Sequence, residues 1–417
     1  MASPNPQDLT FGIELEFMSE APKPSPPRGA YKAARLNIAK LLARHTDFPI
    51  AIECLHNVPE DCIICSRVRR RRDGCTHLFH AGAADVDPDG HLEGVCFVVK
   101  DEPLGEHMSK LNLERNWPGL EIASPIFTAG DLAAGLPDMA RVVAALRDMD
   151  ARVTADEACG LHVHVGVAGG MQLLLAKKML TLVAIFEQTL FFQLVGPSRV
   201  VNACAAPVEK DILLARARAA DNTLVFDPAE STELLGCHVP PVKTMRPAEW
   251  NKHDPTGFYA MLRAVWESRS LQRLCALTRG TSAYRGGCYV SLRTASGQTT
   301  GPQHEKGSLE KTPTTIEFRY AQMSFDMEFV TNWTTVLSQV VKIAQLDAAD
   351  FQKRLASIYE LLNQTAERGE HPWQEMMRQV LGLEDQLPAW KRLRERYCLG
   401  EEIPLLDKEK LLMPVSR

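Results

Sequence analysis

The sequence predicts an α+β fold, in which strand-like segments are mixed with helical segments along the chain. The chain has 417 residues, of which 45% are hydrophobic and 24% charged, close to the average of globular domains. Several short segments alternate apolar and polar residues with a period of two, which is typical of strands. Longer segments between and after them have helical periodicity, and helices are expected there.

The strand-like segments lie in the first four fifths of the chain. Strands are expected at 11–18, 95–100, 120–123, 161–167, 284–294 and 314–322. Helices are expected at 31–45, 132–149, 171–195 and over most of 328–396. The segment 49–84 is expected to be irregular, and the tail beyond Gly400 to be loosely held.

Charge and composition exclude several classes of protein. The net charge of −5 gives no overall basic field, so nucleic acid is not expected as a partner. The most apolar stretch, 171–195, is interrupted by Lys177, Lys178 and Glu187, which favours a buried helix over a membrane span. Residues 1–10 contain no apolar run, and the cysteines number eleven, an odd count. Reduced thiols and a cytoplasmic location, with no membrane partner, are therefore expected.

The first strand carries two acidic side chains on one face. In the segment 11–17 the apolar residues take every second position, and Gly12, Glu14 and Glu16 take the others. Because alternate residues of a strand point to opposite faces, the two carboxylates share a face, about 6.6 Å apart along the strand. Glutamate is depleted in strands, so this placement calls for an explanation.

The same alternation recurs in three later strands. His162 and His164 alternate with apolar residues, Glu317 and Arg319 share a face, and Glu121 lies in a short apolar segment. If these strands form one sheet with their apolar sides against helices, the other side collects seven polar side chains. They are Glu14, Glu16, Glu121, His162, His164, Glu317 and Arg319.

This set of side chains predicts a divalent metal site. Four glutamates and two histidines against one arginine leave an excess of negative charge, and buried carboxylates are costly unless paired or metal-bound. Carboxylates with an occasional imidazole suit Mg²⁺ or Mn²⁺ better than structural zinc. Magnesium held this way usually binds phosphates, and Arg319 could neutralise a transferring phosphoryl group. The alternative is a solvated face of an open antiparallel sheet with structural histidines.

Five short motifs carry a family resemblance. They occupy residues 11–16, 121–125, 160–166, 284–285 and 315–319. In this order they resemble the amidoligase family of ATP-dependent carboxylate–amine ligases, which is related to glutamine synthetase and glutamate–cysteine ligase. The resemblance implies a glutamine-synthetase-like catalytic domain, with a curved, mainly antiparallel sheet and helices packed on its outer face.

The resemblance also implies a domain organisation and a reaction. Residues 1–348 would form the catalytic domain, with a Cys/Arg-rich insert at 50–84 and a helical, Pro-rich insert at 203–277, and 349–417 a C-terminal helical extension. ATP and Mg²⁺ (or Mn²⁺) would drive the joining of a small-molecule or peptide carboxylate to an amine. The reaction would pass through an acyl phosphate and release ADP and phosphate.

The resemblance also implies a role for each residue that matches a family motif. The metal ligands implied are Glu14, Glu16, Glu121, His162 and Glu317. Contacts to ATP are implied for Glu14, His164, Arg285 and Arg319. Catalytic roles are implied for Arg319, Glu317 and Arg285.

Other functions remain open on sequence alone. One is a metal-dependent hydrolase or oxygenase using His162 and His164, although the next acid, Glu187, falls inside an expected helix. Another is a non-catalytic nucleotide-binding protein. The cysteines could bind zinc or be free thiols, and the basic run 67–72 could be a solvated loop, a nuclear signal or a flap at the substrate entrance. The cysteines concerned are Cys54, Cys62, Cys65 and Cys75.

Overall fold

The computed structural model describes most of the chain. The described residues are 9–21, 27–54, 75–79, 96–102, 117–202, 207, 236–240, 261–262, 264–279, 286–295, 297, 299–303 and 307–414. Arg285, Cys62, Cys65 and the basic run 67–72 lie outside them. The proposed roles of Arg285 and of a zinc site therefore stay hypotheses.

The described strands form one mixed, mostly antiparallel sheet, which confirms the α+β class. The strand order is β3-β2-β4-β5-β1-β8-β10-β9, and β6 and β7 both pair with β1. The pairs β1–β5, β1–β7, β2–β3, β4–β5 and β9–β10 are antiparallel, and β2 pairs with β4 in parallel. The bounds are β1 (Leu9–Ser19), β2 (Ile50–Cys54), β3 (Cys75–Phe79), β4 (Phe97–Asp101), β5 (Gly119–Ala123), β6 (Phe127–Thr128), β7 (Val153–Thr154), β8 (Gly160–Val167), β9 (Cys288–Ser291) and β10 (Thr315–Gln322).

Contacts divide the chain into two compact units. The N-terminal unit contains Phe11–Val163, Gln322–Thr331 and Ile403–Arg417. The C-terminal unit contains Met1–Thr10, His164–Ala321 and Asn332–Glu402. The domain boundary expected at residue 348 stays a prediction.

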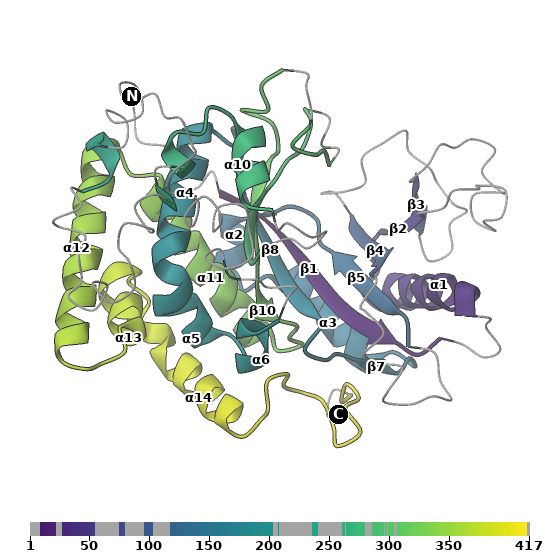
Figure 1. Ribbon diagram of the computed structural model, residues 1–417. Coiled ribbons are helices and arrows are strands. Elements are labelled where there is room, and N and C mark those ends of the chain that lie inside the picture. Colours follow the sequence, from purple (N-terminus) through teal and green to yellow (C-terminus); the bar gives the residue numbers. More distant parts are fainter. Residues whose placement is uncertain are drawn as a thin grey trace. The chain divides into compact units, whose positions relative to one another are not determined.

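In the N-terminal unit, helices pack against one side of the strands. They are α1 (Pro27–Thr46), α2 (Ala129–Ala133) and α3 (Pro137–Asp148). Helix α1 contacts α3 and the strands β2, β4 and β5 (Figure 1). The apolar side chains of β1 are at most 1% exposed from Phe11 to Phe17, as the alternation predicts. Arg35 of α1 donates to Asp101 at the end of β4 at 2.6 Å.

The helix expected at 132–149 is wrong in one respect, because it is two helices. Gly135 and Leu136 both have positive φ, 81° and 55°, and Pro137 begins α3. A left-handed backbone cannot continue a right-handed helix, and Pro fits the first turn of a new one. Thr128 and Asp131 cap the start of α2 with reciprocal hydrogen bonds.

Two further expectations for this unit are wrong. The segment expected to be irregular contains β2 and β3, and Ile50, Ala51 and Ile52 of β2 are fully buried beside β4. Ile50, Ala51 and Ile52 form a continuous apolar run without alternation, and periodicity alone cannot distinguish such a run from a buried helical segment. The tail is not loose, since Leu412 N donates to Val153 O at 2.8 Å and Arg147 donates to Met413 O at 3.1 Å.

The C-terminal unit is mainly helical. Besides β9, most of β10 and part of β8, its described elements are α4 (Leu173–Phe186), the π-helical turn η5 (Glu187–Phe191), α5 (Phe192–Leu194), α6 (Pro197–Val200), α10 (Leu271–Leu277), most of α11 (Met327–Ala344), α12 (Ala348–Glu367), α13 (Trp373–Glu375), the π turn η8 (Met376–Val380), the 3₁₀ turn η9 (Glu384–Gln386) and α14 (Leu387–Cys398). The expected helix 171–195 is thus present as α4, η5 and α5 in sequence.

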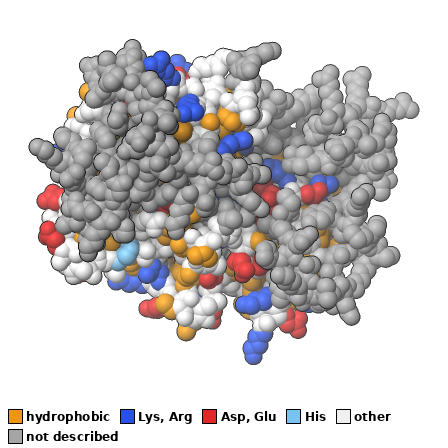
Figure 2. All heavy atoms as spheres, in the orientation of Figure 1, with side chains coloured by type: hydrophobic (Ala, Val, Ile, Leu, Met, Phe, Trp, Pro, Cys, Tyr) orange, Lys and Arg blue, Asp and Glu red, His pale blue; other side chains and the backbone are white. Residues whose placement is uncertain are grey.

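Helix α4 is buried, and its two lysines are satisfied inside the protein. Lys177 Nζ donates to Trp266 O at 2.6 Å, and Lys178 Nζ donates to Leu346 O at 2.5 Å. Among the described residues, no helix combines the length and the apolar character that a membrane crossing needs. The described side chains on the face drawn in Figure 2 include both acidic and basic groups. The cytoplasmic location stays a prediction.

Candidate metal centre

Glu16, Glu121 and His162 come together in the N-terminal unit. They lie on β1, β5 and β8, and one ligand atom of each lies within 4.8 Å of the others. Glu16 is paired directly with Glu121 in the antiparallel register of β1 and β5. The three residues are 3%, 7% and 0% exposed. Ser124, just after β5, stabilises the register between β1 and β5, because its Oγ accepts a hydrogen bond from Ile13 N at 2.9 Å.

The grouping is electrostatically unfavourable without a cation. Like charges directly opposite each other on neighbouring strands destabilise a sheet. Burial, followed by the Glu14 carboxylate, raises the pKa of Glu121 well above its usual value, and Lys100 opposes that shift. A site that collects buried acids in this way favours the binding of a positive ion.

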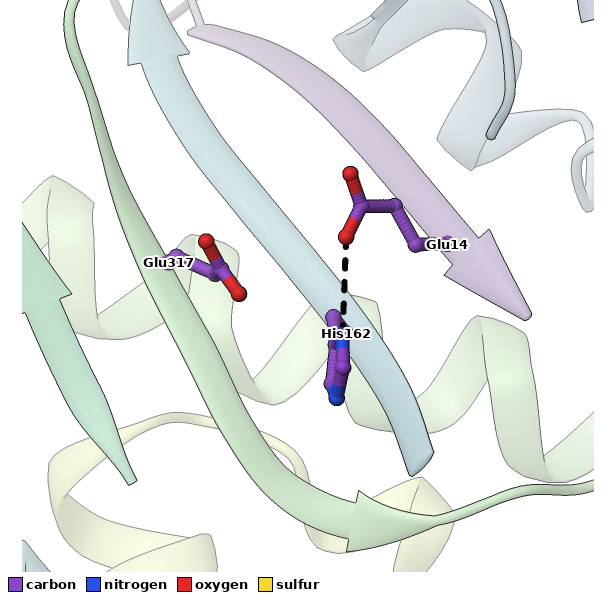
Figure 3. Close-up of side chains that lie close together, drawn as sticks. All are labelled: Glu14, His162 and Glu317. Atoms are coloured by element: carbon purple, nitrogen blue, oxygen red, sulfur yellow. Dashed lines mark ion pairs between the residues drawn. The ribbon is translucent and has the colours of Figure 1, made fainter. Parts of the chain in front are cut away.

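The imidazole of His162 lies between two carboxylates. Its Nδ1 is 3.4 Å from Glu14 Oε2, the pair drawn in Figure 3, and its Nε2 is 3.4 Å from Glu16 Oε1. Gly160 leaves room for this arrangement. A Cβ at Gly160 would lie 2.5 Å from His162 Nε2, and the Gly160 N–H donates to Glu16 Oε2 at 2.7 Å.

The donor set fits Mg²⁺ or Mn²⁺. Magnesium binds oxygen at roughly 2.1 Å, so two ligand atoms of one ion lie at most ~4.2 Å apart. Atoms within 4.8 Å of one another reach such positions by small side-chain movements. Two carboxylates and an imidazole are ligands of these metals rather than of structural zinc, which prefers cysteine and histidine.

A second cluster, around Glu317 on β10, belongs to the C-terminal unit. Glu317 is fully buried, and Arg319 Nη1 donates to its Oε1 at 2.6 Å. His164 Nε2 is 3.4 Å from the other oxygen, Oε2. The His164 Nδ1 is 3.0 Å from Thr315 Oγ1. Both oxygens of Glu317 therefore have a basic neighbour within this unit.

Buried polar residues behind β10 hold its backbone and side chains in place. Arg199, fully buried on α6, donates from Nη2 to the backbone oxygen of Arg319 at 2.9 Å. Tyr320, next to Arg319, points the other way and donates to Glu187 Oε1 at 2.8 Å. Glu187 begins the π turn η5, a feature that often occurs at functional sites. Burial, then Glu187 and Glu317, raise the pKa of the neighbouring Cys288 well above its usual value.

Within each unit, the sequence-derived residues lie near one another. Glu14, Glu16, Glu121 and His162 contact one another in the N-terminal unit, while His164, Glu317 and Arg319 do so in the C-terminal unit. Three contributing residues are not predicted from the sequence, namely Lys100, Arg199 and Glu187. The positive charge of Lys100 and its place at the end of an expected strand are visible in the sequence. Its partner, Glu121, depends on the register in which β4 pairs with β5.

Comparison with known proteins identifies the family. The model of the family described as "Putative amidoligase enzyme" matches residues 7–225, just over half of the chain. Comparison with curated proteins and with solved structures gives no significant match. The matched segment contains the whole N-terminal group and His164, and it ends before Glu317. Because the match covers more than half of its length, the chain belongs to the amidoligase family of amide-bond-forming ligases.

Proposed function

We propose that the chain is an ATP-dependent ligase that uses Mg²⁺ or Mn²⁺ to join a carboxylate to an amine. The acid would be a small molecule or a peptide. The observation that carries this proposal is the buried group of Glu16, Glu121 and His162, which offers a divalent-ion donor set inside the segment matched by the family.

The reaction needs activation of the acid, because a carboxylate has no good leaving group. A carboxylate oxygen of the substrate attacks the γ-phosphorus of ATP, which forms an acyl phosphate and releases ADP. The amine nitrogen then attacks the acyl carbon, the amine loses a proton, and the C–O bond to phosphate breaks. ADP and inorganic phosphate are the products, and positioning with charge neutralisation provides most of the acceleration.

The chain's own residues divide these tasks. Glu16, Glu121 and His162, with Glu14 beside His162, would hold the divalent ion. The ion would supply positive charge to the phosphate oxygens as negative charge moves between them. Arg319 would add a guanidinium for the transferred phosphoryl group.

In this proposal Glu317 is a further metal ligand that also fixes Arg319 through their ion pair. His164 and Arg285 are proposed to contact the nucleotide. A hydrolase or oxygenase built on one ion between His162 and His164 is less well supported. Each histidine has its own carboxylate neighbour, Glu16 for His162 and Glu317 for His164.

The test is the nature of the nucleotide product. Purified protein is incubated with ATP, Mg²⁺ and panels of acids and amines, and ADP, AMP, phosphate and pyrophosphate are quantified. Release of ADP and phosphate that depends on both an acid and an amine is expected. AMP with pyrophosphate, or amide hydrolysis without ATP, would contradict the proposal.

Glu317→Gln is the matched site variant, because it keeps an oxygen for Arg319 while removing the charge. It should abolish turnover at a temperature at which circular dichroism shows the variant to be folded, although the loss of the buried ion pair with Arg319 should lower its thermal unfolding midpoint. Glu360→Gln, at an exposed position of α12, is the control and should keep full activity. Wild-type turnover by Glu317→Gln would reject the role proposed for Glu317.

A further inference from the structure

Lys100 brings an ammonium group among the carboxylates of the candidate metal centre. Its Nζ is 3.2 Å from Glu121 Oε1 and 3.9 Å from Glu14 Oε1. The Lys100 side chain is only 17% exposed. An ammonium group so placed is a fixed positive charge of the cluster rather than a solvated surface charge.

Strand register sets this position. Lys100 on β4 is paired with Glu121 on β5, and Glu121 is in turn paired with Glu16 on β1. The next residue, Asp101, takes the opposite face of β4 and pairs with Arg35 of α1. The pairing of the strands therefore directs the Lys100 side chain towards Glu121 and Glu14.

The two oxygens of Glu14 face different basic groups. Oε1 faces Lys100, and Oε2 faces Nδ1 of His162 at 3.4 Å. On Glu121, Lys100 approaches Oε1. A cation that bridged Glu14 and Glu121 would have to enter where the ammonium already lies, and two positive groups on the same carboxylates repel each other.

We infer that Lys100 acts as a built-in monovalent cation of this centre. It fills the cation position between Glu14 and Glu121, so that the N-terminal unit binds a single divalent ion, through Glu16, Glu121 and His162. The inference rests on the metal binding of the proposed function and deepens it, because it assigns Lys100 as the residue that sets the number of ions. Lys100 is a positioning residue in this scheme and has no step in the reaction.

The test counts bound Mn²⁺ in the full chain without nucleotide, by isothermal titration calorimetry and by the electron paramagnetic resonance signal of free Mn²⁺. Lys100→Met should bind one more equivalent of Mn²⁺ than the wild type. Lys100→Arg keeps the charge and should match the wild type. Arg152→Met removes an exposed positive charge of the same unit, paired with Glu20 and Glu409, and should also match the wild type.

Each other result overturns the inference. Lys100→Met with the wild-type number of ions would show that the ammonium excludes none, while the metal site of the proposed function would still stand. A gain in Arg152→Met as well would assign the effect to overall charge. Absence of Mn²⁺ binding in every protein would reject both this inference and the metal site. Lys100→Gln serves as a second neutral variant if circular dichroism shows that Lys100→Met is not folded.

Discussion

Gly160→Ala is expected to disable the candidate metal centre by adding one methyl group. The new Cβ would lie 2.5 Å from His162 Nε2, 3.0 Å from His162 Cδ2 and 3.0 Å from Glu16 Oε2. Ordinary contacts between such atoms are on the order of 3.5 Å, so the imidazole must move by about 1 Å. The two side chains that the new Cβ would crowd, His162 and Glu16, are proposed ligands. His162 is fully buried, and packed protein interiors leave little room for it to move.

Two magnitudes follow from this clash. Overpacking of a buried site typically destabilises a protein by about 1–3 kcal/mol. A ligand displaced by about 1 Å no longer reaches the ion, and loss of support for a metal ligand weakens binding by roughly 10–100-fold. At a Mn²⁺ concentration 100 times the wild-type Kd, the ion stabilises the wild type by about 2.7 kcal/mol. A tenfold weaker site would then be stabilised by only about 1.4 kcal/mol.

The assay is urea unfolding with and without Mn²⁺, together with calorimetric titration of the metal. Gly169→Ala is the matched control, because Gly169 is exposed just after β8 and a Cβ there meets no atom within 4 Å. It should change neither stability nor metal binding appreciably. Mn²⁺ binding by Gly160→Ala with wild-type affinity would refute the reasoning, since the crowded groups could not then be the ligands.

Two further predictions concern the buried groups behind β10. Tyr320→Phe removes the donor to Glu187 Oε1, and a buried carboxylate that loses a donor should lower the free energy of unfolding by about 1–3 kcal/mol in urea titration. Tyr397→Phe, whose hydroxyl contacts Leu194 O at 3.4 Å, should lose less, and an equal loss would contradict the prediction. Because the pKa of Cys288 is raised on folding, the folded protein holds the thiol proton more tightly than the unfolded chain does. This contribution to stability is fully present below the unfolded thiol pKa of about 9 and is lost as the pH rises towards the folded pKa. Above pH 9 the wild type should therefore lose stability more steeply than Cys288→Ala, by up to about 1.4 kcal/mol per pH unit, and parallel slopes would show that the thiol does not titrate differently on unfolding.

Strands with strict alternation could be predicted because burial of one face dictates their pattern. Phe11, Ile13 and Leu15 are at most 1% exposed, and β1 runs through the segment expected. The short strand β2 could not be found, because its buried run is explained only by the parallel neighbour β4. The division between α2 and α3 was signalled by Gly135 and Pro137, and the apolar periodicity on either side outweighed that signal. The docked tail depends on backbone bonds to β7, which carry no sequence signature.

For the site, alternation predicts which side chains share a face of one strand but not which ones meet across strands. It predicts that Glu16 and His162 lie on the polar face of their strands, while their proximity to Glu121 follows from the pairing of β1 with β5. Lys100 was overlooked because a lysine at the end of a strand is usually solvated. The glutamine-synthetase-like form of the sheet stays a prediction.

The two clusters differ in how their charge is balanced, and this difference decides which variants are informative. In the C-terminal unit, Glu317 has its own guanidinium partner, Arg319, at 2.6 Å. Removing the arginine would leave a buried carboxylate uncompensated, which costs about 3–5 kcal/mol and would mix instability with loss of function. In the N-terminal unit, by contrast, Glu16 and Glu121 face each other directly, and a neutral substitution relieves repulsion. Glu16→Gln should therefore leave the metal-free protein at least as stable as the wild type while weakening Mn²⁺ binding, and a marked destabilisation without metal would show that Glu16 is a structural acid held by the Gly160 N–H.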